Sequence, residues 1–251
     1  MSPWEALAVF AAGIGAGTIN TVVGSGTLLT FPVLLGVGLS PISANVSNTL
    51  GLAPGSAVGA WGYREELSGQ RDRVIRLGTA SLLGGISGAV LLLTLPSSAF
   101  ETIVPVLIVL ALLLVVGGPR LTDALAHTRH RPRTDVGLLL WVVVFATGVY
   151  GGYFGAAQGV LLMGLFGLLL AETLQRQNAL KNVLAGLVNA VAAVVFLFTG
   201  HMNWAAAGLI AAGSMIGGVI GARVGRRLPA PALRAVIVVV GIAAIVKLLT
   251  D

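Results

Sequence analysis

Long apolar runs separated by short connections restrict the fold of this 251-residue chain more than any other feature. The hydrocarbon core of a bilayer is about 30 Å thick, and roughly 20 residues of α-helix cross it. Hydrophobic residues make up 56% of the chain and charged residues 10%, too few charges for a water-facing surface. We therefore expect an all-α integral membrane protein in contact with the lipid bilayer. Eight runs are long enough to span, namely 3–22, 40–62, 74–95, 100–118, 136–154, 178–199, 203–222 and 231–249, and two, 27–38 and 160–171, predict short re-entrant or half helices.

The basic residues are grouped at alternate connections between these runs. Four segments, 64–76, 120–133, 176–181 and 223–234, hold 14 of the 15 lysines and arginines. Because cytoplasmic loops carry an excess of basic residues, all four segments are predicted to lie on the cytoplasmic side. This predicts a multi-pass protein of the cell membrane with its N-terminus outside. The net charge of +6 then reflects topology and does not indicate a nucleic-acid partner.

The two halves of the chain match at a constant offset of 133 positions without a gap. Gly26 falls on Gly159, and Asn45 falls on Asn178. Because the predicted topology starts the two halves on opposite sides of the membrane, we expect an inverted 5+5 repeat, an architecture typical of secondary transporters. The expected parts are a first repeat, 1–118, a basic cytoplasmic linker, 119–135, and a second repeat, 136–251.

Two stretches of the repeat also carry a family resemblance. GAGTINTVVGSGTLLTFPVLLGVGLSPISANVSNTL, and more weakly GVYGGYFGAAQGVLLMGLFGLLLAETLQRQNALKNVL, resemble the TauE/SafE family of membrane permeases, the sulfite-exporter-like proteins. The second stretch departs from the family pattern at 156–159, where glycine-rich sequence is usual. The resemblance covers nearly the whole chain and implies export of a small anion such as sulfite, sulfoacetate or a related organosulfur compound.

A glycine-rich turn precedes each short helix. A helix start exposes unpaired N–H groups and the positive end of the helix dipole, and glycine lets a ligand approach the backbone. These turns therefore predict an anion-binding cradle, and the alternative is that the glycines only permit close helix packing. The candidate residues are Gly24, Ser25 and Gly26 in the first half and Gln158 and Gly159 in the second.

A polar stripe on one helical face is present in both halves. A polar face on a membrane helix is expected to point into the bundle. Lys181 is the only cation in either stripe and suits an anionic substrate, although a lysine near a helix end can also snorkel to the headgroups. Together with Asn20, the stripe residues complete the candidate substrate site: Asn178, Lys181, Asn182 and Asn189 in the second half, matched by Asn45, Asn48, Thr49 and Ser56 in the first.

Enzymatic and cofactor chemistry find little support in the residues. The chain has no cysteine, no HExxH motif and no Ser/His pair within the spans, so we expect no catalytic residue, metal site or cofactor. Acidic residues fall at or near predicted helix ends, so coupling is expected to use the substrate's own protonation or the membrane potential. The main prediction is a secondary transporter of a small anion. An anion-selective channel of the same fold and a membrane-embedded enzyme are the alternatives, and the oligomeric state stays open.

Overall fold

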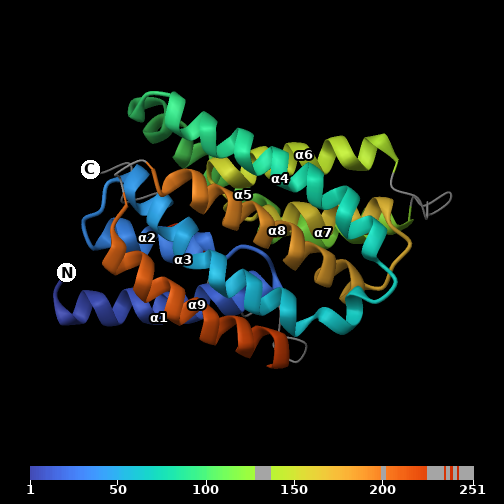
Figure 1. Ribbon diagram of the computed structural model, residues 1–251, viewed down its shortest axis with the longest axis horizontal. Coiled ribbons are helices and arrows are strands. Elements are labelled where there is room, and N and C mark those ends of the chain that lie inside the picture. Colours follow the sequence, from blue (N-terminus) through green and yellow to red (C-terminus); the bar gives the residue numbers. More distant parts are fainter. Residues whose placement is uncertain (128–136, 199–201, 225–234, 236–237, 240–241, 243–251) are drawn as a thin grey trace.

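The computed structural model describes residues 1–127, 137–198, 202–224, 235, 238–239 and 242. Within these residues the elements are all helical, as expected for an all-α membrane protein (Figure 1). In chain order they are α1 (Pro3–Val22), α2 (Thr27–Gly36), α3 (Pro41–Gly62), the 3-10 helix η1 (Arg64–Leu67), α4 (Arg71–Thr94), α5 (Ser97–His127), α6 (Leu138–Tyr153), α7 (Gln158–Leu169), α8 (Leu174–Phe196) and α9 (Trp204–Val224).

Local sequence explains where several helices begin. Ser2 and Glu5 form a capping box at the start of α1. Ser40 accepts a hydrogen bond from the Ser43 amide at the start of α3, and Thr173 caps α8 in the same way. Ser40 and Thr173 are 133 positions apart, so the third helix of each half begins with the same device.

Five helices are long and apolar enough to cross a membrane: α1, α4, α5 over Ser97–Gly117, α8 and α9. α2, α6 and α7 are shorter apolar helices of 10, 16 and 12 residues. α6 begins at Leu138 and ends one residue before the predicted run 136–154 does, and just beyond it Gly155 takes a positive φ and its amide donates to the Tyr150 carbonyl. The run 231–249 lies almost wholly outside the described residues. α5 extends to His127, so the first part of the predicted linker 119–135 is helical.

Glycines allow two pairs of helices to pack with their backbones in contact. Gly84 and Gly88 of α4 face the backbone of α6, where an added Cβ would strike the carbonyls of Phe145 and Val149. Gly217 of α9, 133 positions after Gly84, faces the Ile14 carbonyl of α1 in the same way. These glycines therefore permit the close small-residue packing that is typical of membrane helices.

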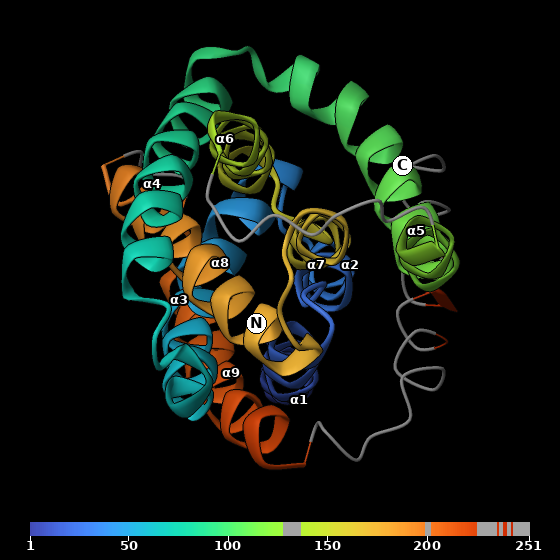
Figure 2. The same cartoon turned by 90° about the vertical axis from the view of Figure 1, so that its right-hand side faces the viewer.

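Helix contacts between the two halves occur in matching pairs. α9 packs against α1 and α3, and α4 packs against α6 and α8, which are the equivalent helices of the other half. α3 and α8 also contact each other. Viewed end-on, α1, α2 and α7 lie in the interior, while α3, α4, α8 and α9 form a wall along one side (Figure 2). Each half therefore packs its fourth helix against the other half.

Candidate substrate site

The starts of the two short helices meet inside the bundle: α2 and α7 overlap in the end-on view (Figure 2) and point toward opposite ends of the bundle in Figure 1. The Gly159 amide donates a 3.0 Å hydrogen bond to the Gly24 carbonyl. Gly24 has φ +90° and its counterpart in the second half, Ala157, has φ 61°, so both turns pass through the left-handed region that favours glycine. A side chain on Gly24 would collide with the Gly159 backbone. The two turns thus form one junction.

Several polar atoms at this junction have no partner in the described part of the chain. The Ser25 hydroxyl and the Gln158 Nε2 atom are buried and make no hydrogen bond there. The backbone amides of Ser25, Gly26 and Thr27 donate to no backbone carbonyl of the described residues, whereas the Gly159 amide is used at the junction. The first turn therefore offers hydrogen-bond donors at a helix start, a suitable position for an anion.

Gly26 also has a packing role. An added Cβ would lie 2.5 Å from the Ala16 carbonyl oxygen and 3.0 Å from the Asn20 Cβ. A larger residue would push α2 away from α1. The two interpretations of this glycine, packing and backbone access, are therefore both compatible with its position.

Lys181 on α8 is completely buried, with 0% of its surface exposed. Its Nζ atom donates to the carbonyls of Asn20 and Thr21 at 2.9 and 3.1 Å, at the C-terminal end of α1. An added Cβ on Gly159 would lie 3.0 Å from the Lys181 Cδ, so the lysine stem passes the start of α7. The side chain therefore does not snorkel to a membrane surface, and the described residues provide no ion pair for it.

Three polar side chains of α8 donate hydrogen bonds to the Thr21 carbonyl. It accepts hydrogen bonds from Lys181, from the Asn178 Nδ2 at 3.2 Å and from the Asn182 Nδ2 at 3.3 Å. The last carbonyls of a helix lack intrahelical partners and carry the negative end of the dipole. The stripe thus caps the C-terminus of α1, and the buried Asn178 Oδ1 has no partner among the described residues.

The first half repeats this arrangement with one difference. The Asn45 Nδ2 donates to the Tyr153 carbonyl at the end of α6 at 2.9 Å, as Asn178 does at the end of α1. Asn48, at the position equivalent to Lys181, instead bonds to α2, where its Nδ2 donates to the Thr27 hydroxyl at 3.2 Å and its Oδ1 accepts from the Thr30 hydroxyl. The stripe of α3 is buried as expected, but it carries no charge.

Asn189 and Thr49 lie differently from the other candidates. The Asn189 Nδ2 and the Asn20 Nδ2 each donate to the Ser56 hydroxyl at 3.1 Å. Ser56 and Asn189 are equivalent positions, 133 residues apart, and they contact each other directly. The Thr49 hydroxyl donates to the Asn45 carbonyl of its own helix at 2.9 Å. Asn189 therefore forms a hydrogen bond between the two halves. The Thr49 hydroxyl proton is already donated within α3.

Three polar residues of this region were not predicted from the sequence. Thr27 and Thr30 are three positions apart on the short helix α2, and both bond to Asn48. Their i, i+3 spacing is the signal that could have found them. Tyr153 has a buried hydroxyl without a partner among the described residues. It corresponds to Asn20 at the offset of 133, and that match could have found it.

Charged residues form a cluster at one end of the bundle, where Glu172, in the connection between α7 and α8, meets Arg73 of α4 and Arg176 of α8. Glu172 accepts hydrogen bonds from Arg73 at 2.9 Å and Arg176 at 2.6 Å. Partial burial of the carboxyl alone would raise the pKa of Glu172, but the two arginines together hold this pKa below its ordinary value. Gln70 adds a bond to the Arg176 carbonyl at 3.3 Å. The cluster ties the starts of α4 and α8 together.

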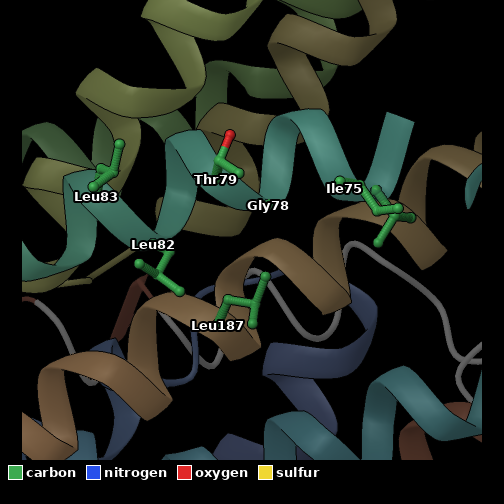
Figure 3. A pocket seen from close by; sticks show the side chains of 7 residues that line it. Ile75, Gly78, Thr79, Leu82, Leu83 and Leu187 are labelled. Atoms are coloured by element: carbon green, nitrogen blue, oxygen red, sulfur yellow. The ribbon is translucent and has the colours of Figure 1, made fainter. Parts of the chain in front are cut away.

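An open groove of about 440 Å³ lies between α4 and α8 and contains none of the predicted site residues (Figure 3). Its lining is almost entirely apolar and includes Ile75, Leu82 and Leu187. Thr79 is its polar lining residue, and its hydroxyl accepts a bond from the Trp141 indole at 3.2 Å. The groove therefore offers no means of binding a small anion.

Comparisons with known proteins assign the chain to a family. The sequence model described as Sulfite exporter TauE/SafE matches residues 9–248. The chain belongs to the TauE/SafE family. It is similar to the probable membrane transporter protein ORF9 of Sinorhizobium sp, with 27% identity over 97% of this chain and 92% of that protein. It is also similar to the probable membrane transporter protein YfcA of Escherichia coli strain K12, with 28% identity over 94% and 86% of the two chains.

No solved structure matches the chain significantly. Membership of the TauE/SafE family, the names of these relatives and the five helices of spanning length agree with one another. Together they indicate a multi-pass membrane transporter, which is the broad class predicted from the sequence.

Proposed function

We propose that this protein is a secondary transporter of a small anion, either sulfite or an organosulfur anion such as a sulfonate. The observation that carries the proposal is the complete burial of Lys181 without a carboxylate partner among the described residues. A buried charge costs several kcal/mol unless it is compensated. Neutral carbonyls compensate it only in part, and a bound anion would supply the missing counter-charge.

The polar atoms beside Lys181 suit an oxyanion. The start of α2 offers the Ser25 hydroxyl and free backbone amides, and the start of α7 offers the Gln158 amide. Lys181 passes Gly159 at the junction of these two helices. Sulfite and sulfonates each carry three oxygen acceptors, which donors from both halves could bind at once. The family description, Sulfite exporter TauE/SafE, supports the same class of substrate.

The proposal includes an inverted 5+5 repeat, made of 1–118 and 136–251 and joined by a cytoplasmic linker. The matching helix contacts of the two halves and the direct contact between Ser56 and Asn189 support it. In this topology the N-terminus lies outside the cell membrane, and the site lies at mid-depth.

Single cysteines test this topology, because the natural chain has no cysteine. Glu65→Cys and Ser98→Cys lie at exposed positions before and after α4. In intact cells, a membrane-impermeant thiol reagent should label Ser98→Cys and should label Glu65→Cys only after permeabilisation. Labelling of both from outside, or of neither, contradicts the topology.

Efflux from loaded proteoliposomes tests the transport activity. Purified protein should release radiolabelled sulfite or a sulfonate such as sulfoacetate faster than protein-free liposomes do. Unlabelled anion on the opposite side should accelerate the exchange of label, as expected for a carrier. Flux that neither saturates nor shows counterflow would indicate an anion channel, and no flux of any tested anion would overturn the proposal.

A further inference from the structure

The position of the Lys181 ammonium in the second half suggests what the first half binds. In the second half the Nζ atom lies at 2.9 and 3.1 Å from two carbonyl oxygens at the end of α1. Carbonyls at the C-terminal ends of interrupted membrane helices also coordinate the coupling cations of secondary transporters. Lys181 therefore holds a tethered cation where a free cation could otherwise bind.

The first half has no such tethered cation. Asn48 occupies the position equivalent to Lys181, and both ends of its carboxamide are bonded to Thr27 and Thr30 of α2. The side chain is thus turned toward α2 and supplies no charge to the end of α6.

The end of α6 leaves several oxygen atoms available. The amides of Phe154 and Gly155 both donate to the Tyr150 carbonyl. As a result, no backbone amide of the described residues donates to the carbonyls of Gly151, Gly152 or Tyr153. These oxygens carry the negative end of the helix dipole.

Asn45 provides a second, independent sign of a ligand at this place. It is completely buried, and its Nδ2 donates to the Tyr153 carbonyl at 2.9 Å. A carbonyl cannot donate a hydrogen bond, so this contact fixes which end of the carboxamide is the oxygen. The Oδ1 atom is therefore held beside the end of α6, buried and without a partner among the described residues.

We propose that the first half contains a site for a monovalent metal cation, sodium, formed by the Asn45 Oδ1 and the terminal carbonyls of α6. All of these ligands are neutral oxygens, and the described residues contain no cluster of acidic or histidine side chains that could hold a metal. Divalent cations normally require carboxylates. The inference rests on the proposed function, since it makes sodium the coupling ion for the anion bound near Lys181. Composition and motifs predict no metal site, because backbone and amide oxygens leave no sequence signature.

Sodium binding to the purified protein, without any anion substrate, tests the site directly. The melting temperature should rise when choline chloride is replaced by sodium chloride at constant ionic strength. Asn45→Ala should weaken this sodium effect about tenfold in concentration, because it removes one ligand. Asn178→Ala, the equivalent change in the second half, should retain it. Equal melting temperatures in sodium and choline, or equal sodium responses of both variants, would overturn the proposal.

The sodium dependence of anion efflux gives a second test of the cation site. Sulfite efflux by the natural protein should require sodium and should fall when choline replaces it. If anion flux through the natural protein does not depend on sodium, the cation site is wrong, and the proposed anion transport is unaffected. If the protein binds sodium but transports no tested anion, the transport proposal is wrong, and the cation site is unaffected.

Discussion

The two halves of this protein place similar asparagine contacts at helix ends but differ in the charge beside them. Asn45 and Asn178, 133 positions apart, each donate to a carbonyl at the end of the first helix of the other half. At the next position of the same stripe, the first half has Asn48, bonded to neutral hydroxyls, and the second has Lys181, bonded to carbonyls. The comparison teaches that a repeated framework can fix backbone geometry while one substitution sets the charge of each half.

The largest expected effect concerns the two left-handed turns. Gly24→Val should destabilise the protein by more than about 3 kcal/mol, because it combines a disfavoured positive φ with a collision against the Gly159 backbone. Thermal unfolding in detergent measures it. Ala157→Gly is the matched change in the second half and should stabilise the protein by up to about 1 kcal/mol. Destabilisation by Ala157→Gly would contradict the strain assigned to the positive φ of Ala157.

The next effect concerns the charge at position 181. Lys181→Gln should weaken binding of the transported anion by about 1.5–3 kcal/mol, which is roughly ten- to a hundredfold in the dissociation constant. Lys181→Arg should rescue this only in part, because a planar fork replaces a compact ammonium.

Asn48→Gln is the control for this prediction, because it alters the equivalent position without changing charge. Isothermal titration with sulfite compares the three variants. If Lys181 acts only as a cap of α1, Lys181→Gln lowers the melting temperature and leaves the dissociation constant unchanged.

A smaller loss of stability is expected at the end of the bundle where α3 and α9 begin. Near the starts of α3 and α9, the Asn203 amide donates to the Ser47 hydroxyl at 2.8 Å. Ser47→Ala should cost about 1 kcal/mol of stability, since one partly buried amide loses its acceptor. The loss should be the same at pH 4 and pH 7, because no titratable group takes part in this bond. A loss that varies with pH would contradict the assignment.

The smallest change in stability is expected on substitution of Glu172 at the opposite end of the bundle, where it bonds to Arg73 and Arg176. The folded state lowers the pKa of Glu172 below its ordinary value of 4.5. Its contribution to stability is therefore present above pH 4.5 and is lost as the pH falls through the lower folded value.

Melting curves at a series of pH values, compared with those of Glu172→Gln, isolate this contribution. The difference in melting temperature between the two proteins should shrink on acidification. It should remain small throughout, because the cluster is partly exposed and screened by water. A difference that grows below pH 4.5 would reverse the assigned direction of the pKa shift.

Much of the fold follows from short-range patterns. Apolar runs and capping residues such as Ser40 and Thr173 place the helices close to their predicted bounds. Asn45 and Asn178, paired by the offset of 133, each donate to a carbonyl at the end of a helix in the other half. The pattern did not predict the left-handed turn at Gly155 just after α6, because that turn depends on backbone geometry and hydrogen bonds and not on hydropathy.

The sequence by itself determined the membrane class, the family, most helix bounds and the burial of most residues of the two polar stripes, because each depends on residues a few positions apart. Only the tertiary structure decided what the buried polar groups contact. Lys181 reaches carbonyls 160 and 161 positions away, and Gly159 bonds to Gly24 in the other half. These contacts depend on how closely helices from the two halves pack, and neither hydropathy nor capping patterns encode that distance.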